Sequence, residues 1–224
     1  SALLDTLDER SHRHAYAVSE DLKFSMREAV ELLGNEAVWY LREVAREKVY
    51  GGAVPAPQLS AECLRYIYRL LFLFYIESRP ELGYAPMNAE AYRTGYSLES
   101  LRDLELLPLE SEEARDGFFL HHSIERLFGL VFEGFGVLTQ ADTEARHDAF
   151  AMPPLKSHLF DPARTPILRR VRFRNAVVQR VIRLMSLSRE RRGKRPGRIG
   201  YAQLGINQLG AVYEGLLSYT GFFA

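Results

Sequence analysis

Apolar residues recur every three or four positions over several stretches of this chain, which is the spacing of one face of an α-helix. Residues 59–78 form the most apolar stretch, hydrophobic on nearly all sides, and Ser60 is placed to cap its start. A helix that is apolar all round is buried, so we expect this segment to be the central helix of the fold. Its expected polar seam is formed by Arg65, Arg69 and Glu77.

Two helices joined by a tight turn are expected before the central one. Residues 16–33 carry apolar residues on one side, and residues 38–45 continue with a second stripe. Between them, Gly34 suits the left-handed residue that ends a helix and Asn35 suits the N-cap of the next, which predicts a helical hairpin. The polar residues 1–15 are predicted to be a flexible N-terminal segment.

Further helices are predicted after the central one, starting with a short helix around residues 98–106 and a longer one over residues 117–132. Residues 137–166 contain four prolines and are expected to be irregular. Thr165 followed by Pro166 is a typical helix start, which predicts a helix over residues 165–187. In residues 199–224 the apolar positions with helical spacing are Leu204, Leu209, Val212, Tyr213, Leu216 and Leu217.

These elements predict an all-α fold, an irregular bundle of about six to seven helices in a single domain over residues 16–224. Hydrophobic residues make up 47% of the 224 residues, which is enough for a sizeable core. No apolar run reaches the length of a membrane span and no signal peptide is visible, so we expect no membrane partner and a cytoplasmic location. The one cysteine, Cys63, lies in the central helix and is expected to be a small core thiol.

Charge is unevenly distributed, although the formal net charge of the whole chain is +0. Residues 99–116 contain seven acidic residues against two arginines, whereas residues 164–198 contain 12 arginines and one lysine with Glu190 as the only acid. Such a basic segment favours a polyanionic partner. The acidic segment is most simply interpreted as a solvated face of the fold.

The basic segment suggests a mechanism for binding double-stranded DNA. On the helix predicted over residues 165–187, four arginines fall within about 60° of one another, opposite the apolar stripe. A row of guanidinium groups along a helix matches the phosphates of a nucleic-acid backbone. These four candidates are Arg169, Arg172, Arg180 and Arg183, and Arg170, Arg174, Arg191, Arg192, Lys194, Arg195 and Arg198 complete the predicted DNA-binding set. The alternative is a charged face that pairs with the acidic segment or docks a partner protein.

Catalytic chemistry has little support in the sequence. The chain lacks a G-x-S-x-G nucleophile motif, a phosphate-binding P-loop and a cluster of metal ligands. His121 and His122 are adjacent, but neighbouring side chains on a helix point about 100° apart and do not easily bind one ion. No catalytic, cofactor-binding or metal-binding residue is therefore predicted.

Three stretches carry more specific patterns. The first is Y-R-L-L-F-L-F-Y-I-E-S-R at residues 68–79, and the second runs from H-L-F-D-P to N-A-V-V-Q-R-V-I-R-L-M-S over residues 158–186. The third is Y-A-Q-L-G-I-N-Q-L-G-A-V-Y-E-G-L-L-S-Y at residues 201–219. In this order they resemble the helical region that precedes the methylase core in type IIG restriction–methylation enzymes and in related adenine-specific DNA methyltransferases of phage-defence systems such as BREX and DISARM.

The resemblance implies a role beside the catalytic core of a methyltransferase, and it assigns no catalytic residue to this chain. In that family the motif for S-adenosylmethionine and the adenine-binding N-P-P-Y lie downstream, in the methylase core, and neither is present in this chain. The implied function is that of a non-catalytic domain of an N6-adenine DNA methyltransferase in restriction–modification or phage defence, with its core beyond residue 224. Implied partners are double-stranded DNA, the methylase core and other defence-system subunits, and S-adenosylmethionine is the cofactor of the parent enzyme. The alternative is a helical protein-interaction scaffold that makes no DNA contact.

Overall fold

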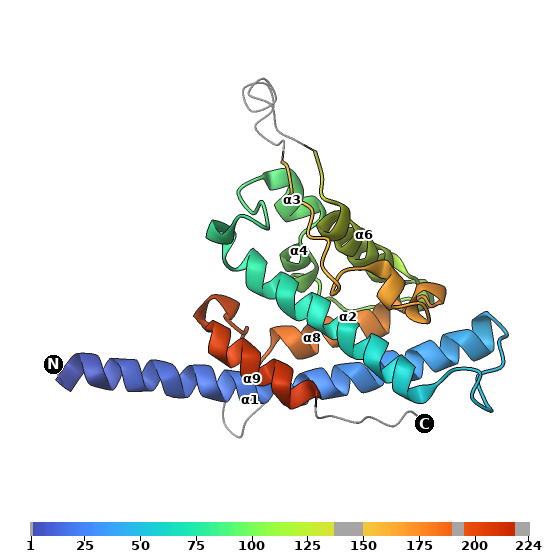
Figure 1. Ribbon diagram of the computed structural model, residues 1–224, viewed down its shortest axis with the longest axis horizontal. Coiled ribbons are helices and arrows are strands. Elements are labelled where there is room, and N and C mark those ends of the chain that lie inside the picture. Colours follow the sequence, from blue (N-terminus) through green and yellow to red (C-terminus); the bar gives the residue numbers. More distant parts are fainter. Residues whose placement is uncertain (1, 137–149, 190–194, 218–224) are drawn as a thin grey trace.

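The computed structural model describes residues 2–136, 150–189 and 195–217, and over these residues the fold is all-α, as predicted. Helix α1 lies along the long axis of the molecule, and α2, α8 and α9 pack against it (Figure 1). The shorter α3 and α4 and the helix α6 lie farther from α1. The helices are α1 (Ala2–Trp39), α2 (Ala56–Glu77), α3 (Glu90–Gly95), α4 (Leu98–Arg102), α5 (Glu112–Asp116), α6 (Phe119–Glu133), α8 (Asn175–Ser186) and α9 (Ile206–Leu217).

Helix α1 runs without a break through Gly34, so the predicted helical hairpin is wrong. The helix also begins at Ala2, which makes the N-terminal segment helical where a flexible one is predicted. The apolar stripe explains this continuity, because the fully buried Leu33 and Ala37 enter the same core on either side of the glycine. A glycine inside a helix costs about 1 kcal/mol, which the burial of the stripe outweighs. The helix ends in a π-helical turn, Tyr40–Val44.

Helix α2 forms the centre of the core, which confirms the prediction for residues 59–78. It begins at Ala56, directly after Pro55, so Ser60 lies inside the helix and does not cap it. Most of its apolar side chains are buried, including Leu70 at 0% exposure. Cys63 is also fully buried, as expected of a core thiol, and this burial raises the pKa of the thiol.

Glu62 and Arg69, two charged side chains of α2, are almost fully buried and bind the irregular chain that precedes α8. The carboxylate of Glu62 accepts two hydrogen bonds from backbone N–H groups, and the guanidinium of Arg69 donates two to backbone carbonyl groups. The partners are Ile167 and Leu168 for Glu62, at 2.9 and 3.0 Å, and Leu159 and Asp161 for Arg69, at 2.7 and 3.0 Å. The expected polar seam of α2 therefore includes Glu62, which the sequence pattern did not indicate.

Glu77, at the end of α2, binds the first turn of α4. Its carboxylate accepts hydrogen bonds from the backbone N–H groups of Leu98 and Glu99, at 2.8 and 2.9 Å, and from the hydroxyl of Tyr92 at 2.9 Å. The first two hydrogen bonds satisfy N–H groups of α4 that have no partner within that helix. Burial raises the pKa of Glu77 to about 7, and the three hydrogen bonds oppose this rise.

Helix α8 begins at Asn175 and not at Thr165, so the first part of the helix predicted over residues 165–187 is wrong. The chain first makes a 3-10 turn, Leu168–Arg170, and the N–H groups of Ile167 and Leu168 at its start bind the buried carboxylate of α2. Residues 171–174 are then extended, with Val171 and Phe173 buried and Arg172, between them, exposed. This alternation has the period of an extended strand, not of a helix.

Helices α4 and α6 confirm the predictions for their regions with shifted ends. Helix α6 starts two residues later than residue 117, at Phe119. The apolar stripe of the predicted helix is buried, and it consists of Leu120, Ile124, Leu127, Phe128 and Val131. Helix α4 covers the first part of residues 98–106, and the short helices α3 and α5 lie in segments for which no helix is predicted. Residues 150–166 are irregular apart from a 3-10 turn, as predicted, and residues 137–149 lie outside the described residues.

Helix α9 begins at Ile206, so the predicted helix over residues 199–224 starts too early. Leu204 is buried but lies before the helix, and Val212 is buried within it, as predicted. Tyr213 is 47% exposed and does not belong to the buried stripe. Leu209 is partly buried against the core, and the last two predicted positions, Leu216 and Leu217, have side chains outside the described part of the chain.

Truncation of α2 should be costly at its buried positions. Leu70→Ala removes a side chain with 0% exposure and leaves a cavity, so it should lower the free energy of unfolding by roughly 2–5 kcal/mol. Phe72→Ala, at a half-buried position, should cost less. Urea denaturation measures both changes, and a loss below about 0.5 kcal/mol for Leu70→Ala would show that α2 is not the core helix.

Candidate functional site

The fold divides the predicted row of arginines. Because α8 starts only at Asn175, the row no longer shares one helix face: four candidates precede the helix and two lie on it. Those before it are Arg169, Arg170, Arg172 and Arg174, and those on it are Arg180 and Arg183. Arg195 and Arg198 lie in the chain that leads to the 3-10 turn Tyr201–Gln203. The candidates Arg191, Arg192 and Lys194 lie outside the described residues.

Arg174 forms the most complete ion pair of this group. Its guanidinium donates two hydrogen bonds to the carboxylate of Glu36 on α1, at 2.7 and 2.9 Å, in a bidentate arrangement. It also lies over the ring of Trp39, 3.7 Å from the ring centroid, and 3.6 Å from a carboxylate oxygen of Asp116. The hydrogen bonds with Glu36 raise the pKa of Arg174. Since its charge is already paired, Arg174 serves as a link between α1 and the start of α8.

Three further arginines of the predicted set also bind groups of this chain. Arg170 pairs with Glu47, and Arg180 pairs with Glu28 at 2.8 Å, so both contact the region of α1 and its following loop. Arg183 is half-buried and donates two hydrogen bonds to the backbone carbonyl of one residue of the acidic segment, Glu105. These contacts hold the three guanidinium groups against the protein.

Arg198 shows that the acidic segment has a partner within the fold. Its guanidinium lies 2.9 Å from Asp103 and 3.3 Å from Glu99, and 3.6 Å from the buried carboxylate of Glu105. These contacts raise the pKa of Arg198, the hydrogen bond that it donates to Asp103 most of all. The pairing of basic and acidic segments, the alternative considered for the sequence, is therefore present at this position.

Arg169, Arg172 and Arg195 are exposed and remain available. Arg169 interacts electrostatically with Glu125, and Arg172 with His121, but none of the three guanidinium groups is in an ion pair with a carboxylate of the described residues. Of the predicted DNA-binding set, these are the described residues whose charge the fold leaves open to a polyanion.

His121 and His122 lie at the start of α6 with ring centroids 5.3 Å apart. His121 is buried against Phe173, and its Nδ1 has no hydrogen-bond partner among the residues that the structure describes. Burial lowers the pKa of His121 to about 4, helped by the neighbouring charges of His122 and Arg172. A neutral, buried imidazole with this surrounding is a packing group of the core.

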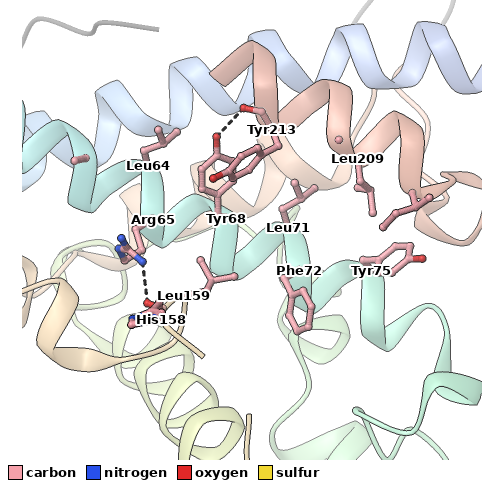
Figure 2. Close-up of a pocket in the computed structure, with 13 residues that line it drawn as sticks. Leu64, Arg65, Tyr68, Leu71, Phe72, Tyr75, His158, Leu159, Leu209 and Tyr213 are labelled. Carbon is pink, nitrogen blue, oxygen red and sulfur yellow. Dashed lines mark hydrogen bonds between the residues drawn. The ribbon is translucent and has the colours of Figure 1, made fainter. Parts of the chain in front are cut away.

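An apolar groove of about 690 Å³ runs along α2, between α9 and the chain at residues 158–159 (Figure 2). Aromatic side chains of α2 form its floor, among them Tyr68, Phe72 and Tyr75. The hydroxyl of Tyr68 donates a hydrogen bond to the backbone carbonyl of Tyr213 on α9, at 3.0 Å, and the two rings lie 4.7 Å apart. The sequence pattern gives α2 as apolar on nearly all sides, but it does not show which face stays uncovered.

Comparison of the chain with protein-family models, with curated proteins and with solved structures finds no match. Among the described helices none is long and apolar enough to cross a membrane. In the same residues no group of three or more His, Cys, Asp or Glu side chains is arranged to hold a metal ion. The candidate functional features are thus the exposed arginines and the groove.

The buried His121 should make the fold sensitive to acid. Between pH 6.5 and 4 the unfolded chain binds a proton at this histidine while the folded protein does not, so unfolding is favoured as the pH falls. His121→Phe removes this proton uptake. The free energy of unfolding of the wild type, relative to the variant, should therefore fall by about 1–2 kcal/mol from pH 7 to pH 5. Urea denaturation at both pH values measures this difference in the free energy of unfolding. An equal pH dependence of the wild type and His121→Phe would contradict the neutral, buried state of His121.

Proposed function

We propose that this chain is a non-catalytic helical domain of an adenine-specific DNA methyltransferase of a restriction–modification or phage-defence system. The proposal rests on the three sequence stretches that resemble such enzymes, and one structural observation supports it. The three stretches, distant in sequence, contact one another around α2. Arg69 of the first stretch binds carbonyl groups of the second, and Tyr68 and Arg79 bind carbonyl groups of the third.

These contacts give the shared patterns a physical reason. In the second stretch, the L-F-D turn presents the carbonyl groups of Leu159 and Asp161 to Arg69. In the third, Arg79 donates to the carbonyl groups of Ala202 and Leu204, at 3.0 Å each, just before α9. Residues that fit together in this way are expected to recur together in proteins with the same domain. Methylation itself, with S-adenosylmethionine and the flipped adenine, belongs to the core on which this domain packs.

Within that enzyme the domain contacts the DNA backbone. The candidates are Arg169, Arg172 and Arg195, which are exposed and not engaged in ion pairs within the described chain. Phosphate contacts by arginine orient a protein on the duplex without reading its sequence. A domain that supplies such contacts would hold the duplex while the methylase core reads and modifies the base.

A protein-interaction scaffold without DNA contact is the second candidate. It is favoured by the internal pairing of Arg170, Arg174, Arg180 and Arg198, because these ion pairs account for much of the basic segment without any nucleic acid. The two functions differ in their response to salt. Release of counterions from DNA makes binding fall steeply with salt concentration, whereas apolar docking changes little.

The test of DNA contact compares two double variants with the same change in net charge. Arg169→Ala with Arg172→Ala removes two open charges and should reduce the slope of log affinity against log salt by roughly two, for duplexes of any sequence. Arg170→Ala with Arg180→Ala removes two charges that already pair with Glu47 and Glu28. This control should change the slope by less than about one.

Fluorescence anisotropy with a labelled duplex at several salt concentrations measures both variants. Circular dichroism checks that both are folded, which is expected because all four side chains lie at exposed positions. If the first variant binds as tightly as the wild type and with the same slope, Arg169 and Arg172 do not contact DNA and the scaffold is the better account.

A further inference from the structure

The groove along α2 is long and apolar. The α2 residues that line it extend from Ala61 to Tyr75, which at the rise of an α-helix is a length of about 21 Å. Its other wall is formed by α9, where Ile206 is 70% exposed and Gly210 leaves open space at the middle of the wall. Figure 2 shows Tyr68, Leu71, Phe72 and Tyr75 directed along one side of this space, and Leu209 and Tyr213 on the opposite helix. A length of about four helical turns, with side chains at helical spacing, matches the apolar stripe of one further helix.

One end of the groove is basic. Arg65 lies there and donates a hydrogen bond to the backbone carbonyl of His158 at 2.8 Å, while Arg164 contacts the Nδ1 of the same histidine at 2.9 Å. No Asp or Glu is among the residues that line the groove, and within the described chain no carboxylate is in an ion pair with Arg65. The guanidinium of Arg65 is therefore an uncompensated charge at the end of an apolar surface.

This charge decides what fits the groove. A second copy of the chain, packed groove against groove, would bring a surface with the same positive charge and no carboxylate to pair with it. A helix with an apolar stripe and a carboxylate at one end would fill the length of the groove and also neutralise the charge of Arg65. We propose that the groove between α2 and α9 docks an amphipathic helix of a separate partner protein, with an acidic side chain placed against Arg65.

This docking site is independent of the proposed function, since it requires neither DNA nor a methylase core. Its energy comes from covering exposed apolar side chains such as Ile206 and Tyr213. Its orientation comes from the charge, because only one direction of the partner helix brings the carboxylate to Arg65. Partner choice would thus depend on the position of one acid relative to the apolar stripe.

The test uses a synthetic, fluorescently labelled peptide of about four helical turns. It carries leucines at helical spacing and a single glutamate one turn beyond the stripe, and a second peptide carries lysine in place of that glutamate. Anisotropy titration of the whole chain should give saturable binding of the glutamate peptide and about fivefold weaker binding of the lysine peptide. The Arg65→Glu variant should instead bind the lysine peptide more tightly than the glutamate peptide.

Two surface variants separate the groove from general apolar adhesion. Ile206→Lys places a charge in the groove and should weaken the glutamate peptide at least about tenfold. Leu106→Lys changes a similarly exposed residue, 64% against 70%, that does not line the groove and should leave binding unchanged. Both positions are exposed, so both variants should fold as the wild type does.

The proposal is overturned by absence of saturable binding of the glutamate peptide up to about 1 mM. It is also overturned if Arg65→Glu does not reverse the order of the two peptides, or if Leu106→Lys weakens binding as much as Ile206→Lys. Sedimentation supplies a further check. A wild-type dimer that becomes a monomer in Ile206→Lys would assign the groove to a second copy of this chain and not to a partner helix.

Discussion

The fold depends on buried charged side chains that bind backbone groups of irregular segments and of helix ends. Helix α2 supplies Glu62, Arg69 and Glu77, and each satisfies backbone groups that have no partner in a regular element. Arg102 of α4 acts in the same way, donating to the backbone carbonyl groups of Ser186 and Ile199. An unpaired backbone group in the interior is costly, so these side chains allow long irregular segments to lie against the apolar helix.

The path of the chain before α8 explains the distribution of basic residues. After the 3-10 turn Leu168–Arg170 the chain becomes extended at Val171 and α8 begins only at Asn175, so its arginines turn to different sides. Arg174 then pairs with Glu36, while Arg169 and Arg172 stay exposed. The sequence predicts one row of arginines that binds a polyanion. In the structure most of these arginines are paired within the chain, and a few are exposed without an ion pair. The uncovered apolar surface lies elsewhere, in the groove between α2 and α9.

The sequence predicts the elements that local pattern determines. The fold class, the central helix and the stripe of α6 follow from apolar spacing, which reports burial directly. The errors of the sequence-based prediction arise where distant contacts override local signals. Gly34 does not end α1, since the apolar stripe continues across it, and Thr165 does not start an α-helix. The alternation of Val171 and Phe173 is the signal that could have indicated the extended chain. Arginine partners and the open face of α2 depend on tertiary packing, which no local pattern contains.

The most direct test of this account is hydrogen exchange at Ile167 and Leu168 in Glu62→Leu. The variant keeps an apolar side chain on α2 but removes the carboxylate that accepts both N–H groups. A hydrogen bond to a charged group contributes about 1.5–3 kcal/mol to the free energy of unfolding, which its loss removes. Protection of these two amides should therefore fall at least about tenfold, while amides inside α6 keep theirs. Unchanged protection at Ile167 and Leu168 would contradict the claim that the buried charges of α2 hold the irregular segments in place.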